Sequence, residues 1–278
     1  MVSPEISPFV KVYPDLGQTT GKACFRIGGP FLQEKESLDT HVLKFPTGGT
    51  GIVKTSEEFP TNVHYILPDA EETIVGRTES TYPAITVRGI KSGLLDQGNL
   101  SGGPPVADLC RKISKKRSEA NERRKEANEP VIKNTNVTDV DVLEEMFRYV
   151  IFHVKDYIKQ DLPKFLQQTR ETYEKRPADQ AQAQLTDDEV LEKIPMHCTF
   201  TIPVRGSEIL RLQMVDACSR AGFKGIDTVS ESAAAAAFAL EDSGLHDLLR
   251  DKNFYLCDLG GVTMVCLISG HCFHYVLN

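Results

Sequence analysis

The sequence of 278 residues predicts an α/β fold, and three observations in its C-terminal third carry that prediction. A strand-like run with alternating apolar residues covers 197–204, and a helical pattern follows over 207–222. A second strand candidate at 226–229 leads into an alanine-rich segment, 233–240, with high helix propensity. Two apolar runs joined by a glycine-containing turn then predict a β-hairpin over 254–270. The order strand, helix, strand, helix, hairpin is typical of an α/β protein.

The helix predicted over 207–222 has recognisable ends. Ser207 can cap its N-terminus with a side-chain hydroxyl, and Gly222 is placed to end it. The apolar residues between these ends fall on one helical face, which we expect to be buried; they are Ile209, Leu212, Met214, Val215 and Cys218.

The middle of the chain predicts a long helix between two polar segments. From Val140 to Phe165 apolar residues recur every three or four positions, which predicts one amphipathic helix facing a core. Before it, residues 97–136 contain a Gly/Pro-rich loop and a dense mixed-charge stretch, which we interpret as a solvated helix or a flexible insertion. A nuclear-import signal or a patch for an acidic partner is the alternative for this stretch. After the helix, residues 174–189 predict a polar linker.

The turn of the C-terminal hairpin has the composition of a phosphate-binding loop. Gly260 and Gly261 let backbone N–H groups approach an anion without a Cβ in the way, and Thr263 adds a hydroxyl donor. Asp258 would orient a water or a hydrated Mg²⁺ ion. The alternative is an ordinary two-glycine turn, in which the aspartate and threonine only satisfy local backbone groups.

Four motifs in this region follow one another in the order seen in a known family. They are Thr201-Ile-Pro203-Val at a strand end, Ala217 to Phe223 at a helix end, Val229-Ser-Glu231 before the alanines, and Asp258 to Thr263. On these motifs the segment 199–269 resembles the nucleotide-binding domain of the 70-kDa heat-shock chaperone family, and within it the divergent chaperone-like ATPases. The resemblance implies an actin-like ATPase (ribonuclease H-like) fold. Residues 1–253 would form its first lobe, and residues 254–278 would be the opening strands of an incomplete second lobe.

The resemblance also implies roles for individual residues. Glu231 would orient a water near the magnesium ion, while Asp258, Gly260, Gly261 and Thr263 would surround the β- and γ-phosphates of ATP. Two positions depart from the family pattern: Val262 replaces a third loop glycine, and Val265 stands where a second loop aspartate is expected. Because that carboxylate helps to position the attacking water in the family, we expect nucleotide binding with weak or absent hydrolysis.

The N-terminal half resembles the same family at its first phosphate loop. Asp15, Gly17, Thr19 and Thr20 match that loop's pattern, although Gln18 is inserted. Pro14 precedes the loop where the family has a continuous apolar strand, and proline cannot donate a hydrogen bond in a sheet. The alternative is an ordinary turn in a shortened N-terminus.

Two further segments extend the resemblance between these loops. Residues 59–65 resemble a single family strand, with Gly76 and Glu79 where a further glycine motif follows. Residues 90–96 resemble a family helix in which Lys91 would face a phosphate as a catalytic residue. A solvated surface lysine is the alternative for Lys91.

Composition and length limit the function classes. The net charge of −7 gives no electrostatic footprint for nucleic acid, and there is neither an apolar run of membrane-spanning length nor a signal peptide. The seven cysteines form no C-x-x-C pair, which favours reduced, mostly buried thiols, and we assign no metal ligands among side chains. We therefore expect a cytoplasmic chain that binds neither nucleic acid nor membrane. Because the chain ends twenty residues after Asp258, we also expect nucleotide binding to be weak and the chain to self-associate.

Two classes of function follow from these expectations. The first is an ATP-binding chaperone-like protein that uses ATP and water-bridged Mg²⁺ and has protein clients or co-chaperones as partners. The second is a truncated or degenerate module without catalysis, which acts through contacts with other proteins. A sugar kinase of the same superfamily is a weaker third option, because the segment around Glu231 points to the chaperone branch.

Overall fold

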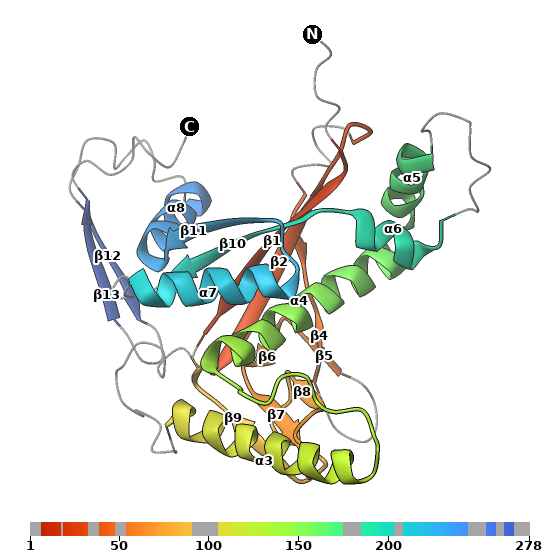
Figure 1. Ribbon diagram of the computed structural model, residues 1–278. Coiled ribbons are helices and arrows are strands. Elements are labelled where there is room, and N and C mark those ends of the chain that lie inside the picture. The colour runs from red at the N-terminus through yellow and green to blue at the C-terminus, as the bar shows by residue number, and fades with distance from the viewer. Residues whose placement is uncertain are drawn as a thin grey trace.

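The structure is a computed structural model, and it describes residues 7–17, 19–32, 39–47, 54–90, 105–174, 185–202, 208–243, 254–259 and 264–269. Its mixed six-stranded sheet and its helices, shown in Figure 1, confirm the α/β class that the sequence predicts.

The largest sheet in the described residues has six strands and is called the main sheet below. Its path is β11-β10-β1-β2-β3, and β6 also pairs with β2. Strand β1 is parallel to β10, β10 is parallel to β11, and β2 is antiparallel to β1. The bounds are β1 Phe9–Leu16, β2 Thr20–Gly28, β3 His41–Val42, β6 Glu58–Pro60, β10 Met196–Ile202 and β11 Gly225–Ser230.

The other described strands form smaller sheets. Strands β4 and β5 pair with each other, β7 lies between β8 and β9, and β12 pairs with β13. Their bounds are β4 Phe45–Thr47, β5 Lys54–Ser56, β7 Val63–Ile66, β8 Thr73–Val75, β9 Ala84–Val87, β12 Phe254–Leu259 and β13 Met264–Ser269. The hairpin predicted in the C-terminal region is therefore present as β12 and β13.

The segment 59–65, expected as one strand, is divided between two sheets. Strand β6 joins the main sheet, and β7 belongs to the sheet with β8 and β9. The division falls at Thr61 and Asn62. The Thr61 N–H still bonds on the side of β2, where it donates to the Thr19 carbonyl at 3.0 Å, whereas the Asn62 side chain donates to the Arg77 carbonyl, beyond β8, at 3.1 Å. These two residues therefore turn the chain from one sheet into the next.

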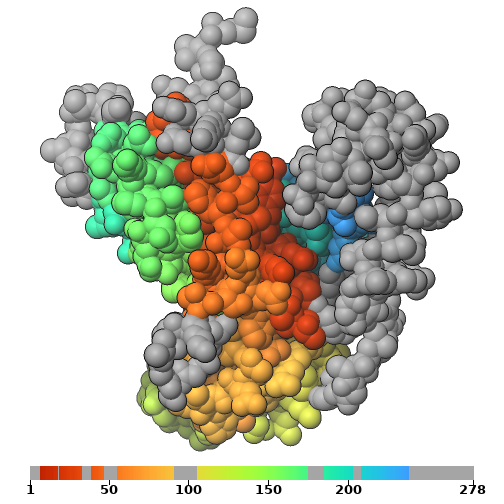
Figure 2. Space-filling view, turned by 180° about the vertical axis from the view of Figure 1, so that it is seen from behind, coloured from red at the N-terminus to blue at the C-terminus, as the bar shows by residue number. Residues whose placement is uncertain are grey.

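Helices α4 (Asp139–Asp161) and α7 (Glu208–Ala221) cover one face of the main sheet, and in Figure 1 they cross in front of it. On the opposite side, Figure 2 shows β1 and β2 at the surface in red and orange. Between helices and sheet lies the core, where the ring of Phe147 from α4 meets the rings of Phe200 and Phe223 at centroid distances of 5.9 and 6.3 Å. The main sheet thus has a core face and a more open face.

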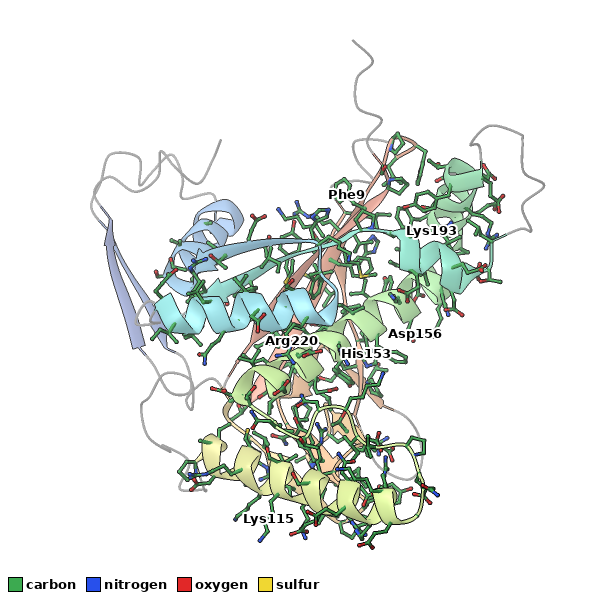
Figure 3. All side chains as sticks on the ribbon, in the orientation of Figure 1. Phe9, Lys115, His153, Asp156, Lys193 and Arg220 are labelled. Atoms are coloured by element: carbon green, nitrogen blue, oxygen red, sulfur yellow. The ribbon has the colours of Figure 1, made fainter. Side chains whose placement is uncertain are left out.

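Ion pairs fasten α7 to α4 beside this core. Arg220, near the end of α7, pairs with Asp141 and with the buried Glu144, and Figure 3 shows it beside α4. Asp141 also completes the capping box of α4 with Thr138. Burial alone would raise the pKa of Asp141, but hydrogen bonds from Thr138 and Arg220 lower it overall. The carboxylate is therefore kept charged at the point where the two helices meet.

The prediction of a single long helix from Val140 to Phe165 is wrong at the C-terminal end of that range. Helix α4 ends at Asp161, and a separate helix, α5, runs over Pro163–Glu174. Proline lacks an N–H and clashes inside a helix, but it is well tolerated at the first helical position. Pro163 therefore ends one helix and begins the next, and Phe165 packs from α5 against Phe31.

The polar linker expected over 174–189 ends earlier than the sequence suggests. Helix α6 (Asp187–Lys193) begins with a capping box between Thr186 and Glu189. It buries Val190 and Leu191, and Asp187, Asp188 and Glu192 form ion pairs with Arg170, Lys159 and Lys155. Residues 187–189 thus belong to a docked helix.

The flexible insertion expected over 97–136 is corrected for its described part, residues 105–136. Residues Val106–Glu126 form helix α3, which is one of the two forms that the mixed charge allowed. This helix is solvated on one side only, because Cys110, Ile113, Arg117 and Ala120 are buried. Lys115, labelled in Figure 3, lies on its outer side.

The apolar face predicted for α7 is partly wrong. Leu210, Met214, Ala217 and Cys218 are buried, whereas Ile209 and Leu212 are 68% and 53% exposed. The buried residues are spaced by four and three positions, so they lie on one side of the helix, which faces α4. The predicted apolar face is turned about the helix axis relative to this buried side. Gly222 ends the helix as predicted, with φ +119°.

Candidate functional site

Three strands of the main sheet end at the same edge, which we call the carboxyl edge. Because β1, β10 and β11 run parallel, their C-terminal ends lie side by side. Asp15 lies one residue before the end of β1, Thr201 one residue before the end of β10, and Glu231 directly follows β11. Residues far apart in the sequence are thereby gathered at one edge, where ligands of open α/β sheets commonly bind.

A hydrogen bond joins two of these residues directly. The Thr201 hydroxyl donates to Asp15 Oδ1 at 3.3 Å, and the Asp15 side chain is exposed. The two residues came from separate motifs, one in the first loop and one at the Thr201-Ile-Pro203 strand end. Their contact shows that the fold brings these two motifs together.

Pro14 does not interrupt β1, contrary to the concern that the sequence raises. The strand is continuous from Phe9 to Leu16, and Pro14 pairs in register with Ala23 of β2. The Val10 N–H points toward the β10 side, where it donates to the Pro195 carbonyl at 3.1 Å. By the alternation of a strand the nitrogen of Pro14 faces the same side, but the β1–β10 register ends at Val12. The β1–β10 ladder therefore stops short of Pro14, which cannot donate to it, whereas the β1–β2 pairing continues past the proline.

The first predicted loop is a tight turn between β1 and β2. A Cβ on Gly17 would lie 2.5 Å from the Thr20 carbonyl oxygen, so only glycine fits there. Thr19 and Thr20 are exposed, and Thr20 already belongs to β2. The turn thus presents hydroxyl groups beside Asp15, an arrangement that suits a bound anion as well as an ordinary hairpin.

Glu231 begins helix α8 (Glu231–Ser243) and is half-buried. The helix is capped by Ser230, whose hydroxyl accepts from the Ala233 N–H at 3.1 Å. A carboxylate in the first turn is favoured by the helix dipole, so Glu231 also stabilises its own helix. Glu231 thus lies at the carboxyl edge, and the helix alone supplies a structural reason for an acidic residue there.

The second predicted loop is described only at its two ends. In the β12–β13 hairpin Asp258 lies opposite Val265 in register, so the position of the expected second aspartate faces the first across the ladder. Gly260, Gly261, Val262 and Thr263 lie outside the described residues, as does Lys91.

Lys22 is a residue of this edge that sequence reasoning missed. It pairs in register with Asp15 on one side and with Glu58 of β6 on the other, and its Nζ lies 2.9 Å from Glu58 Oε1. The hydrogen bond and charge of Glu58 raise the pKa of Lys22, and the charge of Asp15 adds to this. Counting the hairpin register from Asp15 across the turn could have found it.

Cys24, Cys110, Cys198 and Cys218, whose side chains the structure describes, are free thiols. Cys110, Cys198 and Cys218 are buried, and Cys24 is partly buried. Burial raises the pKa of Cys110 to about 12 and also raises that of Cys24, so neither is a reactive thiolate at neutral pH. No group of three or more His, Cys, Asp or Glu side chains among the described residues could hold a metal ion by itself.

In the part of the chain that the structure describes, every helix is too short or too polar to traverse a bilayer. Comparison of the chain with protein-family models and with curated proteins finds no match in either.

Proposed function

We propose that the chain forms the first lobe and the opening strands of the second lobe of an actin-like ATPase domain of the 70-kDa heat-shock type. It would act in the cytoplasm as a chaperone-like protein that binds Mg-ATP, with protein clients or co-chaperones as partners. The order of the main sheet supports this proposal. An antiparallel run β3-β2-β1 continues into the parallel strands β10 and β11, with α4 and α7 as the crossovers.

One observation carries the proposal furthest, namely the hydrogen bond between Asp15 and Thr201 at the carboxyl edge. It joins the N-terminal glycine turn to the first of the C-terminal motifs across 186 residues of sequence. A phosphate site assembled from separate loops requires such a convergence, whereas two unrelated turns do not.

The carboxyl edge also has the right ligand atoms for Mg²⁺. Asp15 and Glu231 offer carboxylate oxygens, and magnesium prefers oxygen ligands while keeping several of its waters. Bound Mg²⁺ would neutralise charge on the phosphates of the nucleotide. Asp15 and Glu231 would hold its water shell, and the hydroxyl groups of Thr19 and Thr20 would donate to phosphate oxygens.

Hydrolysis is expected to be weak or absent in this proposal. Phosphoryl transfer to water depends on a group that positions the attacking water. The position expected to supply a second carboxylate is Val265, which lies in β13 opposite Asp258 and cannot accept a hydrogen bond from water. Binding can therefore persist without efficient turnover.

The experiment is isothermal titration of the purified chain with Mg-ATP. We expect the wild-type chain to bind and Asp15→Asn to bind about tenfold more weakly or worse, because the substitution removes a charge that orients the hydrated metal. Asp227→Asn is the matched control: it removes an exposed carboxylate from β11 of the same sheet, four residues before Glu231.

The alternative function, a non-catalytic module that acts through protein contacts, is favoured by the exposure of Ile209 and Leu212 on α7. A folded wild-type chain that does not bind Mg-ATP in this titration would contradict the nucleotide proposal and favour the alternative. Equal weakening by Asp15→Asn and Asp227→Asn would show that binding occurs away from the carboxyl edge.

A further inference from the structure

Near the β1–β2 turn, the Lys22 ammonium group pairs with Glu58 of β6, and Lys22 stands opposite Asp15 of β1. Lys22 lies between Asp15 and Glu58 in the ladder, because it is in register with both. Directly opposite residues of neighbouring antiparallel strands present their side chains on the same face of the sheet. The ammonium group is thus placed on the face from which the Asp15 carboxylate projects.

A triphosphate needs positive charge that these carboxylates do not supply. Asp15 and Glu231 are both acidic, and Mg-ATP keeps a net negative charge. Without a cation, electrostatic repulsion would oppose its binding at the carboxyl edge. Lys22 is well suited to supply the charge, since its side chain is 60% exposed and it follows Thr20 by two residues in β2.

Lys11, on the same face of the sheet, is badly placed for this task. It precedes Asp15 by four positions on β1, which corresponds to about 13 Å along a strand. Its Nζ lies 5.9 Å from the centre of the Tyr13 ring and 3.7 Å from Asp227 Oδ2. These contacts hold it toward the middle of the sheet.

We propose that Lys22 is the phosphate-binding cation of this site, and that it leaves Glu58 for the triphosphate when the nucleotide binds. This inference rests on the proposed function. The exchange costs little, because Glu58 is 45% exposed and an ion pair between exposed side chains contributes little to stability. The gain is larger, because a charge-assisted hydrogen bond to phosphate is stronger than an exposed ion pair. Glu58 therefore competes with the nucleotide for Lys22.

Titration of four variants with Mg-ATP and with Mg-triphosphate tests the inference. Lys22→Met should weaken binding of both ligands about tenfold or more, because one charge-assisted hydrogen bond is lost. Glu58→Gln should strengthen binding about threefold, because it removes the competing carboxylate. Lys44→Met, which removes an exposed lysine near β3, is the matched control and should bind like the wild type. Lys91→Met tests the rival lysine.

The outcomes separate the two proposals. If the wild type binds and Lys22→Met binds within twofold of it, the role of Lys22 is wrong while the nucleotide site stands. The same conclusion follows if only Lys91→Met loses binding. If the folded wild type binds neither ligand, both proposals fail. Circular dichroism of each variant verifies that it is folded.

Discussion

Replacing Phe147 by alanine is expected to lower the free energy of unfolding by about 3–5 kcal/mol. Phe147 is fully buried in α4, and its ring meets Phe200 of β10 and Phe223 after α7. The substitution removes a large apolar side chain where helices and sheet converge, and it leaves a cavity that the surrounding rings can fill only in part.

The matched control is Phe152→Ala on the same helix. Phe152 is 63% exposed, so the same chemical change should cost less than about 1 kcal/mol there. Urea unfolding followed by circular dichroism measures both variants, with the midpoint and slope compared to the wild type. Similar losses from the two substitutions would contradict the position of α4 against the sheet.

Replacing Arg117 by methionine is expected to cost about 2–4 kcal/mol, since it leaves two carbonyl groups without their donors. Arg117 is buried in α3, where Nε donates to the Ala70 carbonyl at 2.8 Å and one terminal nitrogen donates to the Asn134 carbonyl at 2.9 Å. Its guanidinium also lies 5.5 Å from the centre of the Tyr65 ring. Methionine keeps the apolar stem of the side chain but none of these interactions.

Arg111→Met is the control for this prediction. Arg111 lies on the same helix, its side chain is exposed and it pairs with Asp108, so its replacement should cost less than about 1 kcal/mol. Urea unfolding gives the change in stability, and amide hydrogen exchange shows where it acts. We expect faster exchange in α3 and around Ala70. An unchanged stability of Arg117→Met would show that α3 is only a solvated helix.

Much of the fold was predictable because local patterns agree with the packing. The strand before Ile202, the helix ending at Gly222 and the hairpin that contains Asp258 all have apolar periodicity and end signals in the sequence. Where the apolar pattern and the end signals of an element coincide, packing against neighbouring elements favours the same secondary structure.

The errors fall where tertiary contacts determine which residues are buried and where a helix ends. The mixed charge of α3 does not reveal that Arg117 is buried, because its partners are carbonyls distant in sequence. The apolar periodicity from Val140 to Phe165 continues across Pro163, so the break between α4 and α5 is visible only in the proline itself. On α7, Leu210 is buried and Leu212 is exposed, although the two residues are alike in the sequence.

The candidate site was predicted in part. Asp15, Thr201 and Glu231 came from separate motifs, and the sheet brings the ends of their strands together. Lys22 was missed because it belongs to no sequence motif. Its position beside Asp15 and Glu58 follows only from the register of β1, β2 and β6. Its neighbours in the sequence, Gly21 and Ala23, carry no chemical signal.

The central claim is that the two glycine turns bind the same nucleotide, and titration of the isotope-labelled chain with Mg-ATP, followed by amide chemical shifts, tests it most directly. We predict that the amides of Gly17, Thr19 and Thr20 shift together with those of Gly260, Gly261 and Thr263, along curves with one dissociation constant. Shifts confined to one turn, or located on other parts of the chain such as α3, would contradict the claim.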